Sequence, residues 1–287
     1  MNIQKIILEL NFQEIINSSY IKYEKLNGGT VSNLYLLDDG ENGKFVVKSN
    51  EPQFLEAEVH FLDFYKDINL LPNLVYIEPS YHYIVYSFVS GSTNYGLKNK
   101  KEILTSLVQH FINHYKIVPR LQGWGWADDL TDSWQDFLLN RVLESKKILN
   151  SDLKSEDSDL VIRLVKSHNR NNSISKPFLL HGDCGVHNFI FKEGHLCGVI
   201  DPSPVYGEPI YDLIYAFCSS PDDLTIETFN SAVNHLKFTE SESRQLIYEK
   251  VLIGLYLRLA TCMKRHPEDK EDYLRAWSYW KEIVKES

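Results

Sequence analysis

The chain has 287 residues, with 39 acidic and 30 basic side chains and a formal net charge of −9. This length allows one large domain or two lobes that share a cleft. The sequence has neither a Lys/Arg block nor an apolar run of membrane-spanning length, which argues against nucleic-acid and membrane partners. We expect a soluble, cytoplasmic protein with free thiols, and the acidic balance favours a cationic small molecule as its partner.

The first ninety residues predict a small sheet with two helices. Apolar residues at helical spacing between Ile3 and Leu10 predict an amphipathic helix, and a second helix is predicted from Pro52 to Tyr65. Strands are predicted at residues 35–37, 44–48 and 83–89. The turn at residues 38–43, rich in Asp, Asn and Gly, joins the first two strands as a hairpin.

Beyond this region the pattern becomes largely helical. Small and turn-forming residues at 91–99 predict a hinge between an N-terminal lobe at 1–90 and a C-terminal lobe at 100–287. Helices are predicted at residues 100–116, 133–149, 158–168, 241–263 and 271–284, and short strands at 189–191 and 197–200. These elements indicate an α+β fold with a small β-rich lobe followed by a larger, mainly helical lobe.

The most informative motif lies at residues 181–201. The run H-G-D-C-G-V-H-N places Asp183 five residues before Asn188, and Asp201 follows thirteen residues later. In kinase-type phosphoryl transfer an Asp takes the proton of the attacking hydroxyl, while an Asn and a second Asp hold magnesium. The spacing predicts Asp183 as the catalytic base and Asn188 and Asp201 as Mg²⁺ ligands. A hairpin at 189–200 would return Asp201 to Asn188; taken singly, Asn188 could be a turn residue and Asp201 a helix cap.

The N-terminal lobe offers a lysine of the expected kind. Lys48 ends an apolar strand, where a kinase lysine holds the α- and β-phosphates of the nucleotide. Glu58 on the following helix is its predicted partner, with Glu56 as the alternative. Without the motif at 181–201, Lys48 would be interpreted as a solvated lysine at a strand end.

Further nucleotide contacts are predicted in the same lobe. The turn at 27–33 would cover the phosphates, because glycines let backbone N–H groups approach closely, although an ordinary hairpin turn fits equally. Its predicted contacts are Gly28, Gly29 and Ser32. Ser87 and Val89, directly before the hinge, would offer backbone groups to adenine.

Two residues are expected to support the catalytic loop. A separate set of residues is expected to line the acceptor site. His181 would brace the loop, and Asp212 would fix its backbone amides as a buried acceptor. Candidate acceptor contacts combine carboxylates with aromatic faces. They are Asp128, Asp129, His187, Asp272 and Trp277, with Trp124, Trp126, Trp134 and Trp280 as further aromatic candidates. For Trp277 the alternative is packing of the last helix on the core.

These motifs resemble those of the aminoglycoside phosphotransferase family, small-molecule kinases related to choline and fructosamine kinases. The resemblance rests on H-G-D-x-x-x-x-N at 181–188, on Ile200-Asp201, and on Gly207-Glu208-Pro209 before Asp212. It implies a bilobal protein-kinase-like fold with a nucleotide-binding N-terminal lobe. It also implies Mg²⁺ with ATP, or in some members GTP, and transfer of the γ-phosphate to a hydroxyl.

Differences between this sequence and the motifs of related kinases narrow the predicted class of kinase. Pro202-Ser203 follows Asp201, and only ten residues separate Asp201 from Asp212, which leaves no room for the activation segment of a protein kinase. Asp201-Pro202 and Tyr206-Gly207 resemble fructosamine kinases, whereas the Cys-Gly-Val-His of the catalytic loop does not. We therefore expect an ATP-dependent kinase of an aminoglycoside, amino sugar or related molecule. The alternatives are a ketosamine kinase and a non-catalytic nucleotide-binding protein.

Overall fold

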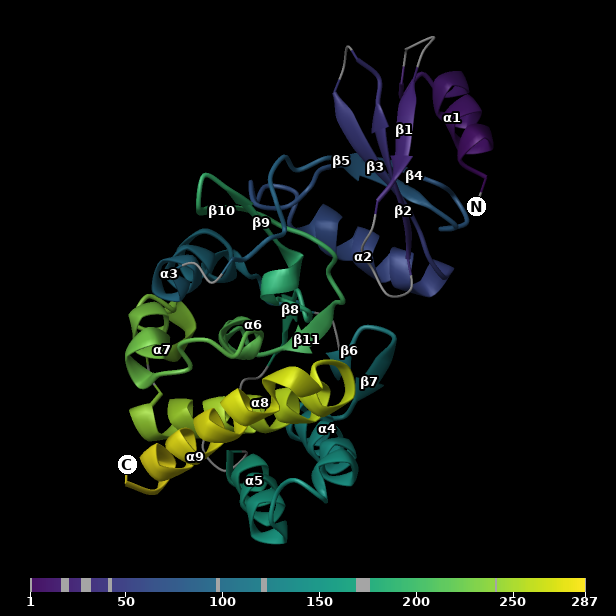
Figure 1. Ribbon diagram of the computed structural model, residues 1–287. Coiled ribbons are helices and arrows are strands. Elements are labelled where there is room, and N and C mark those ends of the chain that lie inside the picture. The colour runs from purple at the N-terminus through teal and green to yellow at the C-terminus, as the bar shows by residue number, and fades with distance from the viewer. Residues whose placement is uncertain are drawn as a thin grey trace.

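A computed structural model shows a β-rich N-terminal region followed by a mainly helical one (Figure 1). It describes residues 2–16, 21–26, 32–40, 43–96, 99–119, 123–168, 176–240 and 242–286. In these ranges no helix combines the length and the apolar character needed to cross a membrane. All four cysteines are free thiols, and Cys184 in the catalytic loop is fully buried.

The N-terminal sheet is antiparallel, with strand order β1-β2-β3-β5-β4. Its strands are β1 (Lys22–Lys25), β2 (Asn33–Asp38), β3 (Lys44–Ser49), β4 (Leu74–Ile77) and β5 (Ile84–Ser87). The predicted hairpin is confirmed, because β2 and β3 pair from Asn33 with Ser49 to Asp38 with Lys44. Strands β1 and β4 were not predicted; both are four residues long, β1 is exposed throughout and β4 has no fully buried residue.

Two helices cover opposite faces of this sheet. Helix α1 (Ile3–Phe12) packs on the face that holds Val47, whereas α2 (Pro52–Phe64) packs on the face that holds Val46. Successive side chains of a strand point to opposite faces, so Lys48 shares the face of Val46 and points toward α2. The alternation in β3 thus directs the one lysine in the middle of the sheet to the helix that carries the predicted acidic partners.

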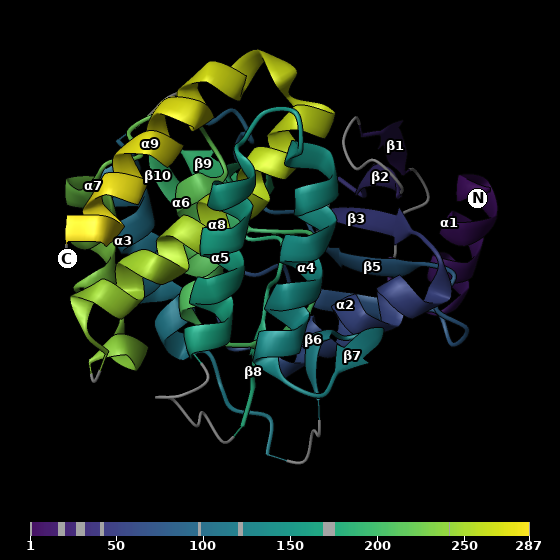
Figure 2. The same ribbon diagram turned by 90° about the horizontal axis from the view of Figure 1, so that it is seen from below.

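The C-terminal region is mainly helical, and its longest helices lie at the end of the molecule away from the N-terminal sheet in Figure 1 and toward the viewer in Figure 2. The helices are α3 (Lys100–His110), α4 (Trp134–Leu149), α5 (Ser155–His168), α6 (Ile210–Cys218), α7 (Ile226–Val233), α8 (Arg244–Arg265) and α9 (Lys270–Glu286). Short 3₁₀ turns occur at Ile112–His114, Val186–Asn188, Lys237–Thr239 and Pro267–Asp269. Helix α8 is central: α4, α5, α6 and α9 all pack against it.

Short strands lie between these helices and the N-terminal sheet. Strands β6 (Trp124–Trp126), β7 (Asp129–Thr131), β8 (Phe178–Leu180) and β11 (Val205–Gly207) form a sheet of order β7-β6-β11-β8. Strands β9 (Phe189–Lys192) and β10 (His195–Val199) form the predicted hairpin. The five helices predicted beyond the hinge are confirmed, although α3 ends at His110 and α5 already begins at Ser155.

The predicted hinge segment is hydrogen-bonded to the C-terminal region. Ser92 and Phe191 of β9 exchange backbone hydrogen bonds of 2.9 and 2.8 Å. The division into lobes at residues 91–99 stays a prediction. The sheet and the long helices nevertheless lie at opposite ends of the molecule, with β9 and β10 near the connection between them (Figure 1).

Candidate active site

The start of the catalytic loop is held by one buried carboxylate. Residues 181–188 connect β8 to β9, and Asp212 in the first turn of α6 accepts hydrogen bonds from the N–H groups of His181 (2.8 Å) and Gly182 (3.1 Å). The hydroxyl of Tyr115 donates to the same carboxylate at 2.6 Å. Burial raises the pKa of Asp212 to about 6, so these three donors hold an anion at neutral pH.

The ring of His181 links this loop to the segment that carries Asp201. Its Nε2 lies 3.0 Å from the backbone oxygen of Ile200. Burial lowers the pKa of His181 to about 4, so the ring is neutral at physiological pH and Nε2 carries the proton that Ile200 accepts. In return, the N–H of Ser203 donates to the backbone oxygen of His181 at 2.9 Å. The fully buried histidine therefore has the surroundings of a bracing residue.

Three side chains surround the carboxylate of Asp183. Asn188 Nδ2 donates to its backbone oxygen and to Oδ2, both at 2.9 Å. His187 Nε2 lies 3.2 Å from Oδ2, and the hydroxyl of Tyr215 donates to Oδ1. Burial pushes the pKa of Asp183 upward, but hydrogen bonds and charge from His187 and the Tyr215 hydroxyl outweigh it, and the pKa lies below its usual range. The carboxylate is ionised at neutral pH and can accept a proton.

The β9–β10 hairpin returns Asp201 to Asn188, as the spacing predicts. The N–H of Ile200 donates to the backbone oxygen of Asn188 at 2.9 Å. Because the amide nitrogen of Asn188 is bound to Asp183, its amide oxygen is the atom that it can offer to a cation. Asp201 has a positive φ of 60°, a conformation that is uncommon outside glycine and clusters at functional sites.

Lys48 reaches from the N-terminal sheet to Asp201. Its Nζ donates to Glu58 Oε2 at 2.6 Å and also to Asp201 Oδ1. Glu58 lies on the buried side of α2, whereas Glu56 faces solvent, so the structure pairs Lys48 with Glu58. Burial alone would lower the pKa of Lys48, but attraction by Glu58 and Asp201 outweighs it and raises the pKa. The lysine is therefore a fixed positive charge between two carboxylates.

The remaining predicted nucleotide contacts lie on the same sheet. Gly28 and Gly29 lie outside the described residues. Ser32 lies directly before β2, and its Oγ accepts a hydrogen bond of 3.1 Å from Asn50 Nδ2, at the far end of β3. The two side chains connect the ends of neighbouring strands close to Lys48.

The segment after β5 presents backbone groups. Ser87 exchanges backbone and side-chain hydrogen bonds with Asn73, each of 2.9 Å. Within the described ranges the backbone N–H of Val89 donates to no other group of the chain. The side chain of Val89 packs so closely on Gly198 of β10 that a Cβ there would lie 2.6 Å from Val89 Cγ1. Val89 therefore combines an apolar contact with a free donor.

The oxygen-bearing side chains of the site are better suited to magnesium bound together with a nucleotide than to a metal ion held by the protein alone. The described residues contain no cluster of three or more His, Cys, Asp or Glu side chains arranged around a metal position. Asn188 and the Asp201 side chain, which is 42% exposed, supply hard oxygen atoms. Magnesium commonly takes one or two protein ligands and completes its shell with water and phosphate oxygens, so these two residues suffice.

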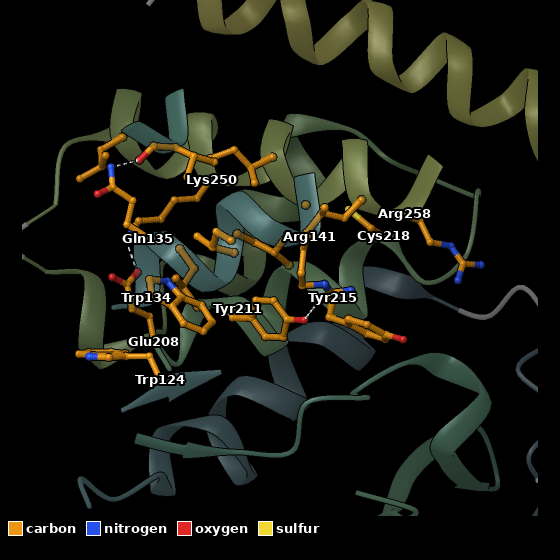
Figure 3. Close-up of a pocket in the computed structure, with 18 of the residues that line it drawn as sticks. Trp124, Trp134, Gln135, Arg141, Glu208, Tyr211, Tyr215, Cys218, Lys250 and Arg258 are labelled. Carbon is orange, nitrogen blue, oxygen red and sulfur yellow. Dashed lines mark hydrogen bonds and ion pairs between the residues drawn. The ribbon is translucent and has the colours of Figure 1, made fainter. Parts of the chain in front are cut away.

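A pocket of about 360 Å³ lies between α4, α6 and α8 (Figure 3). Tyr215 forms part of its wall and donates through its hydroxyl to Asp183, so one side chain connects the pocket to that carboxylate. Most of the lining is aromatic or aliphatic. The charged lining residues are Arg141, Glu208, Lys250 and Arg258. This is the size and composition of a small-molecule site.

Four of the predicted acceptor contacts lie outside this pocket. Asp128 and Asp129 are exposed at the turn between β6 and β7, and Asp272 is exposed on α9. Trp277 is 2% exposed, and its ring centroid lies 5.8 Å from that of Tyr256, which is the core packing considered as its alternative. His187 alone of these five lies at the site, through its contact with Asp183, whereas the further candidates Trp124 and Trp134 line the pocket.

Several residues at the site were not predicted from the sequence. Tyr215 lies three residues after Asp212, so recognising α6 as a helix would have placed both near the loop. Tyr115, Arg141 and Lys250 carry no such signal, because their contacts are made with residues far away in the sequence.

Comparisons with known proteins agree with the motifs. The profile of the phosphotransferase enzyme family matches residues 22–244, which is most of the chain. None of the curated proteins matches the sequence.

Solved structures share the fold. A candidate fructosamine-3-kinase from Haemophilus somnus has a TM-score of 0.61 and 21% identity, with 92% of each chain covered. An ADP-bound aminoglycoside phosphotransferase has a TM-score of 0.58 and 19% identity, covering 96% of this chain and 98% of that one. A choline kinase from Cryptosporidium parvum has a TM-score of 0.59 and 13% identity, covering 99% and 98%. These likenesses show the bilobal kinase-like fold, and the profile match shows that the chain belongs to the phosphotransferase enzyme family.

Proposed function

We propose that the protein is an ATP-dependent kinase that transfers the γ-phosphoryl group to a hydroxyl of a small molecule. The observation that carries this proposal is the contact of Lys48 with both Glu58 and Asp201, which joins the N-terminal sheet to the hairpin beside Asp183. Solved structures of similar fold include aminoglycoside phosphotransferases with bound ADP or ATP, which supports ATP as the phosphoryl donor. GTP stays a second possibility for the nucleotide test.

The chemistry needs a base and an aligned acceptor. As the acceptor oxygen bonds to the γ-phosphorus, the bond to the β,γ-bridging oxygen breaks and ADP leaves. The acceptor proton passes to Asp183, whose lowered pKa keeps it ionised beforehand. A weak base suffices, because the proton moves late in a loose transition state. Asn188, Tyr215 and His187 orient this carboxylate.

Lys48 and the two oxygen-bearing side chains would hold the phosphates. Lys48 remains charged and, held by Glu58, can bind phosphate oxygens. Asn188 and Asp201 would hold Mg²⁺, which when bound cancels negative charge on the phosphates. We place adenine at Ser87–Val89, where the N–H of Val89 is free to donate. In this proposal residues 91–99 act as the hinge between a nucleotide-binding lobe and a catalytic lobe.

The test is a turnover screen with Mg²⁺ and ATP or GTP. The acceptor panel comprises aminoglycosides, amino sugars, ketosamines and other small alcohols, both cationic and anionic. We expect Asp183→Asn to lower kcat about 10²–10⁴-fold while ATP binding is retained. Asp159→Asn, at an exposed aspartate of α5 outside the pocket, is the matched control and should be unaffected. ATP-dependent thermal stabilisation without transfer to any acceptor would favour the non-catalytic alternative instead.

A further inference from the structure

Two arginines in the pocket are bound to aromatic groups. Arg141 Nη1 donates to the hydroxyl of Tyr211, and its guanidinium lies 5.4 Å from the ring centroid of Trp126. Arg258 Nε donates to the hydroxyl of Tyr273 at 2.9 Å, and its guanidinium lies 5.4 Å from the centroid of that ring. Across the described part of the chain, neither guanidinium forms an ion pair with a carboxylate. Both arginines are therefore positioned without being neutralised.

The other charges of the pocket are held in one cluster, in which two glutamates share a single lysine. Lys250 Nζ lies 2.8 Å from Glu208 and 2.9 Å from Glu242, and the three side chains are only 10%, 13% and 6% exposed. Among the described lining residues Glu208 is the one carboxylate, and it is bound to Lys250. The lining thus carries two arginines without a carboxylate partner, and its one glutamate is already bound to Lys250; the ionised carboxylate next to the pocket is the proposed base, Asp183, behind Tyr215.

The arginines lie at the end of the pocket where transfer would occur. Figure 3 shows Arg141 and Arg258 on the side of Tyr215, with Trp124 and Glu208 toward the other end. Arg141 donates to Tyr211, whose ring centroid lies 6.3 Å from that of Tyr215, and Tyr215 in turn donates to Asp183. Arg258 lines the same pocket as Tyr215. An anionic group bound by the arginines would therefore leave a hydroxyl of the same small molecule within reach of Asp183.

We propose that the acceptor is a hydroxyl compound that carries an anionic group beside an apolar portion, and that Arg141 and Arg258 bind this group. The inference rests on the proposed function, since it names the acceptor class for the same site. Each guanidinium has five N–H donors, and a carboxylate matches its planar fork. The aromatic and aliphatic lining suits the apolar portion. A polycationic aminoglycoside would face two arginines, and the glutamate of the lining is already bound to Lys250, contrary to the expectation from net charge.

Binding of matched probes to the full chain tests this inference independently of turnover. The probes are 4-(hydroxymethyl)benzoate, 4-(hydroxymethyl)benzamide and 4-(hydroxymethyl)benzylamine, which share one aromatic alcohol and carry an anionic, a neutral and a cationic group opposite it. We expect calorimetry to show benzoate binding about tenfold or more tightly than the amide, because charge-assisted hydrogen bonds are the stronger kind. The amine should bind most weakly. Equal or tighter binding of the amine, or no binding of the benzoate, would overturn the inference.

Variants of the two arginines test whether these residues cause the preference for the benzoate. Arg141→Gln and Arg258→Gln should each reduce the ratio of benzoate to amide affinity, whereas Arg265→Gln, exposed at the end of α8, should leave it unchanged. The ratio is measured within one protein, so a general loss of stability cancels. Arg258→Glu should shift the preference toward the amine. An unchanged ratio in both Gln variants would also overturn the inference.

Transfer assays separate the two proposals. If the benzoate binds with the expected arginine dependence but Mg²⁺ and ATP support no phosphoryl transfer to any acceptor, the proposed function fails while the pocket assignment stands. If phosphate is transferred to the amine but not to the benzoate, the proposed function stands and the anionic acceptor class is wrong.

Discussion

The hydroxyl of Tyr215 donates a hydrogen bond to Oδ1 of Asp183, while the rest of the side chain lines the pocket. One residue thus belongs both to the wall that would hold the acceptor and to the surroundings of the proposed base. Burial would raise the pKa of Asp183, and hydrogen bonds from His187 and Tyr215 reverse that effect. The ionisation of the base therefore depends on a group that the acceptor would also contact.

Replacing Tyr215 by Phe should change the pH dependence of kcat/KM. The variant removes a donor to the ionised carboxylate, so the pKa of Asp183 rises and the acidic limb of the profile moves to higher pH. Above this limb the loss should stay within about tenfold, the size of one hydrogen bond. Tyr76→Phe is the matched control, because Tyr76 also donates to a carboxylate, that of Glu9, at a distant place. An unshifted limb would contradict the role of the Tyr215 hydroxyl.

The two glutamates of α2 should behave differently. Glu58→Gln removes a charge that lies buried beside Lys48, and we expect it to reduce the free energy of unfolding by about 3 kcal/mol, the lower end for a broken buried pair, because Asp201 still contacts the lysine. It should also raise the KM for ATP. Glu56→Gln, on the exposed side of the same helix, should change stability by less than about 0.5 kcal/mol.

Urea denaturation and ATP kinetics on both glutamine variants measure these effects. Equal losses in the two proteins would show that the Lys48–Glu58 contact has no special importance.

Gly182 is held where a side chain cannot be accommodated. Its φ is +80°, and a Cβ would lie 1.9 Å from the backbone oxygen of Ser203. Gly182→Ala should therefore destabilise the protein by about 3 kcal/mol or more and lower kcat, because the Asp183 loop must move. Gly194→Ala is the control: its φ is +90°, but nothing lies within 4 Å of the added atom, so only about 1 kcal/mol of backbone strain is expected. Thermal or urea unfolding would show whether the two losses differ.

Local patterns predicted the parts of the site that depend on local geometry. The alternation of β3 and the helical stripe of α2 place Lys48 and Glu58 on facing surfaces, and the hairpin between Asn188 and Asp201 follows from a single apolar–turn–apolar pattern. These relationships need only the strand period of two and the helix period of 3.6. The same reasoning distinguishes Glu58 from Glu56, which lies off the buried stripe of α2.

The missed parts depend on contacts between distant segments. Strands of three residues, such as Phe178–Leu180 and Val205–Gly207, are too short to show a period, and they become strands because they pair with one another. The charge of the pocket was not predicted from the sequence for a similar reason. Arg141 on α4 and Arg258 on α8 are brought to one cavity by helix packing, so net charge could not predict it. Residue composition indicated a cationic partner, whereas we propose an anionic one from the pocket.

His181 should make the stability of the protein sensitive to acid. Its pKa is lowered by burial from an ordinary 6.5 to about 4, so between these values the unfolded chain binds more protons than the native one. The contribution of His181 to the free energy of unfolding is fully present above pH 6.5 and decreases as the pH drops toward 4. The decrease between pH 8 and pH 5 is about 2 kcal/mol. Asp212, whose pKa is raised, acts in the opposite direction.

The contribution of His181 can be isolated by comparing urea unfolding of the wild type and His181→Asn at pH 8 and pH 5. The variant removes the titrating ring but keeps Asp212, so the opposing effect of that carboxylate is present in both proteins and cancels in the difference. We expect the variant to be less stable at both pH values, because a buried ring that packs against Phe61 and Phe111 is lost. Its additional loss on acidification should, however, be smaller than that of the wild type by about 2 kcal/mol. Parallel pH dependences would mean that the ring is protonated, or solvated, in the native protein, and its hydrogen bond to Ile200 would then not be that of a neutral imidazole.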